Sequence, residues 1–174
     1  MSTQYRAAII GHTGQGNYGH GLEMVYGQMP EVEVVAVADP DPEGLAAAGE
    51  RTGAARGYAD YREMLEKERP DIVSVCTSAK PRAEIVQTIA SMVAGVKAIY
   101  ADKPIAISLE EADAMVDVFH LAGIVLAVNC SLRWDPLSLL LFFLFRPLPP
   151  FFFFFSSFLS LFFFFSLPPS PPPH

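Results

Sequence analysis

Cysteine is scarce in this chain of 174 residues, which contains only Cys76 and Cys130. Two cysteines so far apart in the sequence exclude a disulfide-rich scaffold and a zinc site built from cysteines, because both need several closely spaced thiols. The sequence does not decide whether these two cysteines form a disulfide, but we expect reduced thiols and a cytoplasmic protein. Since histidines and carboxylates also lack the spacing of metal ligands, we expect no bound metal.

Basic residues are few as well. Of the 12 Lys and Arg residues only Arg146 lies beyond residue 136, whereas all 19 Asp and Glu residues lie before it. A domain with this negative balance repels phosphate backbones, which argues against nucleic acid as a partner. Residues 1–6 are polar and lead directly into an apolar segment, so we expect no signal peptide ahead of it.

Residues 137–174 lack acidic residues altogether and consist of Leu, Ser, Phe and Pro, apart from Arg146 and His174. Codons made only of pyrimidines encode these four residue types, so we expect this low-complexity tail to result from a frameshift or a sequencing artefact. A membrane anchor over residues 151–167 is one alternative, although that run is short for a spanning helix. A packed part of the fold is the other, although the tail shows neither helical nor strand periodicity.

Residues 1–136 show six strand patterns that alternate with five helical ones. Strands of this type, apolar and rich in β-branched residues, are typical of a parallel sheet covered on both faces. We therefore predict an α/β fold with a doubly wound parallel sheet in this segment. The pattern defines boundaries for only five of the six strands, at 6–10, 32–38, 72–76, 96–101 and 124–128. The five helical patterns cover 20–28, 42–51, 61–68, 81–93 and 108–121.

A glycine-rich turn follows the first predicted strand. It matches the spacing Gly-x-Gly-x-x-Gly at residues 14–19, and a second register that starts at Gly11 stays open. Glycines let the main chain approach a pyrophosphate closely, and the start of a helix offers unpaired N–H groups to it. We therefore predict a dinucleotide-binding turn that uses Gly11, Thr13, Gly14, Gly16, Asn17 and Gly19.

Asp39 ends the second predicted strand, about twenty residues after the turn. A carboxylate at this position can accept hydrogen bonds from the hydroxyls of a ribose. No arginine follows it, and Asp41 lies close by, so a 2′-phosphate would meet negative charge. We therefore predict NAD rather than NADP as the cofactor. The alternative role for Asp39 is to cap the following helix.

Two later loops also lie at the carboxyl edge of the predicted sheet. Thr77 follows the strand at 72–76 and could contact a phosphate or ribose, or it could belong to a simple polar loop. Lys103 follows the strand at 96–101 and is held beside Pro104. Its ammonium could orient a substrate hydroxyl near the nicotinamide, or it could be a solvent-exposed charge in a turn. We predict a binding role for both residues and a catalytic role for Lys103.

Taken together, these motifs resemble the family of glucose–fructose oxidoreductase, inositol dehydrogenase and the rhizopine catabolism protein (Gfo/Idh/MocA). The resemblance covers residues 5–136. It is carried by the segments 9–20, 37–41, 58–65, 70–77 and 102–104, and residues 129–136 look like the passage into the family's second domain.

The resemblance implies an NAD(P)-binding Rossmann domain and hydride transfer at a sugar or cyclitol carbinol. Lys103 matches the lysine of the family's Glu-Lys-Pro motif, but Asp102 replaces its glutamate, and Arg82 stands where a histidine is common. The family's second domain supplies further catalytic groups, most of the substrate pocket and the oligomer surface. We expect that domain to be missing beyond residue 136.

The sequence thus predicts the NAD-binding N-terminal half of an oxidoreductase that acts on a sugar or polyol hydroxyl and is inactive in this truncated form. The alternative is a non-catalytic dinucleotide-binding module with the apolar tail as a membrane anchor.

Overall fold

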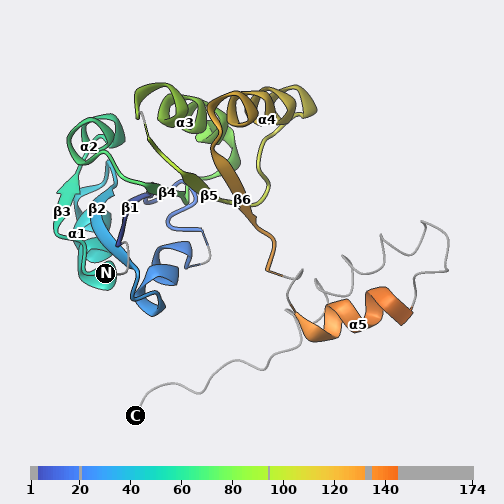
Figure 1. Ribbon diagram of the computed structural model, residues 1–174. Coiled ribbons are helices and arrows are strands. Elements are labelled where there is room, and N and C mark those ends of the chain that lie inside the picture. Colours follow the sequence, from blue (N-terminus) through green and yellow to red (C-terminus); the bar gives the residue numbers. More distant parts are fainter. Residues whose placement is uncertain (1–3, 20, 94, 132–134, 145–174) are drawn as a thin grey trace, which may run out of the picture. The chain divides into compact units, whose positions relative to one another are not determined.

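The computed structural model describes residues 4–19, 21–93, 95–131 and 135–144. Its centre is a six-stranded sheet in the order β3-β2-β1-β4-β5-β6, and all neighbouring strands are parallel (Figure 1). The predicted doubly wound parallel sheet is therefore confirmed. The strands are β1 (Tyr5–Ile10), β2 (Val32–Ala38), β3 (Arg56–Tyr58), β4 (Ile72–Val75), β5 (Ala98–Asp102) and β6 (Val125–Asn129).

Helices cover both faces of this sheet. On one face α2, α3 and α4 pack over the strands, whereas α1 and the 3-10 helix η1 lie on the other (Figure 1). Each helix connects two parallel strands, as such crossovers require. The helices are η1 (Leu22–Gln28), α1 (Pro42–Thr52), α2 (Tyr61–Glu68), α3 (Ala79–Met92) and α4 (Leu109–Ala122).

The alternation of side chains along β1 builds a core on each face of the sheet. Ala7 and Ile9 belong to the core beneath η1 and α1, whereas Ala8 and Ile10 belong to the core beneath α2, α3 and α4. All four residues are buried, with at most 2% of their surface exposed. Because β1 has no solvent-facing side, it reads as a continuous apolar run rather than an alternating one.

The helix starts follow from short polar side chains at the predicted caps. The carboxylate of Asp41 accepts a hydrogen bond of 2.7 Å from the N–H of Gly44 at the start of α1. Asp60 accepts one from Arg62 at the start of α2, and Ser108 accepts one from Glu111 at the start of α4. These caps satisfy donors that the first helical turn leaves unpaired.

The first helix differs from the prediction. Instead of a helix over 20–28, the structure has the seven-residue 3-10 helix η1, and His20 lies outside the described residues. Gly19 and Gly21 both adopt positive φ angles, of 48° and 84°. Because a right-handed helix needs negative φ, the helix cannot begin before Leu22.

The chain divides into two compact units, Met1–Cys130 and Ser131–His174. In the second unit Pro136–Leu144 forms α5, although the sequence of the tail shows no helical periodicity. Leucine favours helices, and the carboxylate of Asp135 accepts a hydrogen bond of 2.7 Å from the N–H of Ser138 near the helix start. Residues 145–174, with the run 151–167 considered as an anchor, lie outside the described residues. Within the described ranges no helix has the length and apolar character needed to cross a membrane.

Candidate cofactor site

The predicted site residues follow the carboxyl ends of adjacent strands. Gly11 follows β1, Asp39 follows β2, Thr77 lies just beyond β4, and Lys103 follows β5. β1 lies between β2 and β4 in the sheet. The strands that follow β1 in the sequence are therefore added first on one side of it, as β2 and β3, and then on the other, from β4 to β6. In open α/β sheets ligands bind at such a switch point.

The glycine-rich turn after β1 folds back on itself between His12 and Asn17. The N–H of His12 donates to the carbonyl of Asn17, and the N–H of Asn17 donates to the carbonyl of His12, both at 3.0 Å. The amide oxygen of Asn17 accepts a bond of 2.9 Å from the N–H of Gly14. These hydrogen bonds within the turn stabilise its hairpin shape.

Gly16 is needed because the turn lies against the loop after β4. A Cβ atom at this position would lie 2.3 Å from the main-chain nitrogen of Ser78, and the φ angle is +96°. The N–H of Ser78 also donates to the carbonyl of Gln15 at 3.1 Å. The turn and the Thr77–Ser78 segment therefore form one continuous main-chain surface.

Asp39 is buried, with 1% of its surface exposed. Its carboxylate accepts hydrogen bonds from the N–H and the hydroxyl of Thr13, at 3.0 and 2.8 Å, and from the N–H of Asp41 at 2.9 Å. Burial acts to raise the pKa of Asp39, but these hydrogen bonds hold it below its ordinary value. The alternative role for Asp39 is wrong, because Asp41 and not Asp39 caps α1.

Tyr18 lies beneath the turn and was not identified from the sequence. Its ring occupies the space that a side chain at Gly11 would fill, because a Cβ atom there would lie 2.3 Å from the ring. The guanidinium of Arg51 lies over the same ring, 5.2 Å from its centroid. Burial, together with the neighbouring carboxylate of Asp39, raises the pKa of Tyr18. Gly11 is therefore required by this packing as well as by any approach of a ligand.

A cavity of about 440 Å³ opens beside Asp39. Tyr61 and Arg62 at the start of α2 line it together with Thr77. Arg62 forms an ion pair of 2.7 Å with Glu84. The sequence reasoning missed Arg62, because only the fold brings the start of α2 beside the end of β2.

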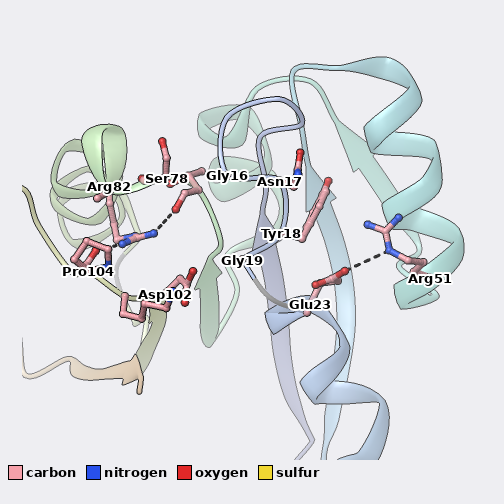
Figure 2. Close-up of a pocket in the computed structure, with 14 residues that line it drawn as sticks. Gly16, Asn17, Tyr18, Gly19, Glu23, Arg51, Ser78, Arg82, Asp102 and Pro104 are labelled. Atoms are coloured by element: carbon pink, nitrogen blue, oxygen red, sulfur yellow. Dashed lines mark hydrogen bonds and ion pairs between the residues drawn. The ribbon is translucent and has the colours of Figure 1, made fainter. Parts of the chain in front are cut away.

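A second cavity, of about 640 Å³, opens on the other side of the turn (Figure 2). Asn17, Thr77 and Lys103 line it, and on its far side Glu23 pairs with Arg51 at 3.3 Å. Asp102 stands where the Glu-Lys-Pro motif named above has its glutamate, and it also lines this cavity. Its carboxylate accepts a hydrogen bond of 3.4 Å from the side-chain amide of Asn129. The two cavities share Thr77.

The predicted site residues fall into three groups. Gly16, Asn17, Gly19, Thr77 and Lys103 line the larger cavity, whereas Gly11, Asp39 and again Thr77 line the smaller one. Thr13 and Gly14 line neither, since Thr13 contacts Asp39 and Gly14 contacts Asn17. Across the described ranges no three His, Cys, Asp or Glu side chains are grouped to hold a metal ion.

This arrangement fits a dinucleotide. It offers a carboxylate for hydroxyl groups at one end, a glycine-rich main-chain turn in the middle, and a cavity with a lysine at the other end. Such a crevice, with glycine turn and acidic residue at the ends of β1 and β2, is typical of NAD-binding sheets.

Comparison with known proteins agrees with this geometry. Residues 5–130 match the family GFO_IDH_MocA, described as an oxidoreductase family with an NAD-binding Rossmann fold. D-apiose dehydrogenase from Paraburkholderia graminis is 35% identical over 133 residues, which cover 76% of this chain and 34% of that protein. The scyllo-inositol 2-dehydrogenase (NAD(+)) of Bacillus subtilis is 27% identical over 136 residues, which cover 78% of this chain and 38% of that enzyme.

Among solved structures, an oxidoreductase from Agrobacterium radiobacter in complex with NAD+, L-tartaric acid and magnesium superposes with a TM-score of 0.67 at 27% identity. The superposition covers 76% of this chain and 37% of that one. The chain thus spans little more than a third of the length of the proteins it matches. On the family match over residues 5–130, this chain belongs to the Gfo/Idh/MocA oxidoreductase family and contains its NAD-binding Rossmann domain.

Proposed function

We propose that this chain binds NAD across the glycine-rich turn as the cofactor-binding half of an oxidoreductase that acts on a sugar or polyol hydroxyl. The observation that supports this most directly is the position of Asp39. Its carboxylate lies at the end of β2 beside one cavity, and the turn separates it from a second cavity with Lys103. The two cavities and the turn together provide separate places for the two halves of a dinucleotide.

In this proposal Asp39 accepts hydrogen bonds from the hydroxyls of the adenosine ribose. Thr13 now donates to this carboxylate, so ribose binding requires that the hydrogen bonds from Thr13 be shared with the ribose or broken. The main chain of the glycine-rich turn lies against the diphosphate in this proposal. The N–H groups of Thr13 and Gly14 now donate to Asp39 and Asn17, so their hydrogen bonds would have to be shared with the ligand. Thr77 lines both cavities and lies where it can contact the middle of the cofactor.

Lys103 is the proposed catalytic residue, because it lines the cavity assigned to the nicotinamide half. A lysine ammonium there can donate hydrogen bonds to a substrate hydroxyl and hold it toward the cofactor. NAD, when bound, supplies the acceptor for hydride, and the protein supplies binding and orientation. Further groups would come from outside the described residues.

The relatives suggest the substrate class. Those named above act, by their names, on apiose and scyllo-inositol, which are a sugar and a cyclitol. We extend this substrate class to the present chain. We also propose a cytoplasmic location, which the free thiols of Cys76 and Cys130 support. We also propose a functional division into a Rossmann domain of residues 1–136 and a tail of residues 137–174.

We further propose that a polypeptide of these 174 residues alone binds NAD weakly and does not turn over substrate, because it corresponds to about a third of its relatives. Isothermal titration with NAD tests the binding. We expect saturable binding that Asp39→Asn weakens about tenfold, the effect of losing roughly 1.4 kcal/mol of binding free energy. Asp117→Asn, on the exposed side of α4, is the matched control and should leave the affinity unchanged.

Unchanged affinity in Asp39→Asn would remove the ribose assignment, and absence of binding in the unaltered chain would remove the proposed function. Resequencing the coding DNA separates the truncated enzyme from the alternative, a membrane-anchored binding module. A continued reading frame of ordinary composition supports the enzyme, and a confirmed apolar tail with the protein found in membranes supports the anchored module.

A further inference from the structure

Arg82 is a buried arginine near the start of a helix, which is an unusual position for a cation. It lies in the first turn of α3, and only 1% of its surface is exposed. A cation near a helix N-terminus is disfavoured by the helix dipole, and a buried cation loses its hydration. Burial accordingly lowers the pKa of Arg82. Within the described ranges no carboxylate lies within ion-pair distance of it.

The guanidinium is directed to two main-chain carbonyls instead. Nη1 donates to the carbonyl of Pro104, and Nη2 donates to the carbonyl of Thr77 (Figure 2). Thr77 lies beyond the end of β4, and Pro104 lies beyond the end of β5. One side chain therefore joins the two neighbouring loops after the ladder between their strands has ended.

These two loops are the ones that carry Thr77 and Lys103. Lys103 is bounded by Asp102, the last residue of β5, and by Pro104, whose carbonyl Arg82 holds. Because proline fixes its own φ, fixing its carbonyl restricts the path of the chain on the C-terminal side of Lys103. The place of Lys103 on the cavity wall is thereby coupled to the place of Thr77.

We propose that Arg82 is a positioning residue that holds the loops after β4 and β5 together, so that Thr77 and Lys103 face one cavity. The role of that cavity rests on the proposed function, whereas the coupling of the loops rests on the hydrogen bonds alone. A planar guanidinium can donate to two carbonyls in a fixed fork, and a lysine ammonium at the same position has no such fork. Arg82→Lys therefore keeps the charge and removes the bridge.

Hydrogen exchange of the full chain without ligand tests the coupling directly. We expect Arg82→Lys to speed exchange in the segments 76–80 and 102–107 together, about tenfold, while exchange in α1 stays unchanged. Lys80→Ala, an exposed cation on the same helix, is the matched control and should change neither segment. Unchanged exchange in both segments, or faster exchange throughout the chain, would overturn the proposal. If Arg82→Lys does not fold, Arg82→Gln, which keeps a single donor nitrogen and lacks the guanidinium fork, provides the same comparison.

Titration with NAD and with ADP-ribose connects the bridge to binding. ADP-ribose lacks only the nicotinamide ring, so the difference between the two ligands reports the cavity that Lys103 lines. We expect Arg82→Lys to weaken NAD binding about tenfold and ADP-ribose binding much less. An equal loss for both ligands would contradict the positioning role. If the unaltered chain binds neither ligand, the proposed function fails, and faster exchange in the two loops still supports the bridge.

Discussion

The hydroxyl and the main-chain N–H of Thr13 both donate to the carboxylate of Asp39, at 2.8 and 3.0 Å. The two residues are 26 positions apart, and their contact joins the glycine-rich turn to the end of β2. Gly44 makes this contact possible, because a Cβ atom there would lie 1.9 Å from the Thr13 hydroxyl. The carboxylate is therefore held in place before any ribose reaches it.

Thr13→Val removes the hydroxyl donor and keeps the shape of the side chain. We expect the free energy of unfolding to fall by about 1.5–3 kcal/mol, since a hydrogen bond to a charged group contributes on that order. The pKa of Asp39 should rise toward its ordinary value, because one of the donors that lower it is lost. Denaturant unfolding and NMR titration of the carboxyl measure the two effects.

Thr88→Val is the control for this change, because its hydroxyl donates to a carbonyl within α3 at 2.8 Å on an exposed face. It should alter the free energy of unfolding by no more than about 0.5 kcal/mol. Equal losses from both substitutions would contradict the special role of the Thr13–Asp39 contact.

Gly16→Ala tests the close approach of the turn to the loop after β4. The added methyl group would meet the main chain of Ser78 at 2.3 Å in addition to the strain of a φ angle of +96°. Gly14→Ala carries only the strain, at a φ of +82°, with no atom within 4 Å of its Cβ. We expect a loss of about 1–2 kcal/mol of stability for Gly14→Ala and about 1–3 kcal/mol more for Gly16→Ala. Thermal or urea unfolding measures both, and similar losses would show that the loops are not in contact.

Stability should fall at acidic pH partly through Glu68. Hydrogen bonds from Arg56 lower its pKa, with further contributions from Tyr58 and Arg6, although burial opposes the shift. Because the folded-state pKa lies below the unfolded value of 4.5, the contribution is complete above that pH. It is lost as the pH falls through the lowered folded-state pKa.

Glu68→Gln should therefore destabilise the chain at neutral pH and make its stability decline less steeply below about pH 4.5. Asp39 and Asp71 have lowered pKa values too, so part of the decline will remain. Glu66→Gln, an exposed neighbour on α2, should keep the full decline. Urea titrations across this pH range make the comparison, and an unchanged slope in Glu68→Gln would refute the assignment.

Cofactor choice should depend on Asp39. We expect the unaltered chain to bind NAD more tightly than NADP, because a 2′-phosphate would face this carboxylate. Asp39→Ser should reduce the ratio of NAD affinity to NADP affinity about tenfold or more. The substitution removes the repulsion between the carboxylate and the 2′-phosphate, and it leaves Arg62 beside the same cavity. Competition between the two cofactors in a fluorescence titration measures the ratio, and a ratio unaffected by the substitution would speak against Asp39 as the selecting group.

Local patterns were enough to predict the parallel sheet and to place five of its six strands to within two residues. The apolar runs of β1 and β2, and the caps at Asp41, Asp60 and Ser108, are signals within short segments. The strand β3 was not delimited, because Arg56–Tyr58 is too short for any alternation. The first helix was predicted too long, because the positive φ angles at Gly19 and Gly21 arise from the folded turn.

The contacts within the site could not be predicted in this way. Position at the carboxyl edge of the sheet identified Asp39, Thr77 and Lys103, since parallel strands all end at the same edge. The contact of Thr13 with Asp39 and the place of Arg62 require that separate loops meet in space. The bridge from Arg82 to Pro104 likewise spans two strand ends and has no local signal.

The most direct test of the account is a crystal structure of the chain soaked with NAD. We predict the adenosine ribose at the Asp39 carboxylate, the diphosphate against the main chain of the glycine-rich turn, and the nicotinamide in the cavity that Lys103 lines. NAD bound elsewhere on the chain, or a nicotinamide placed on the Asp39 side, would contradict it.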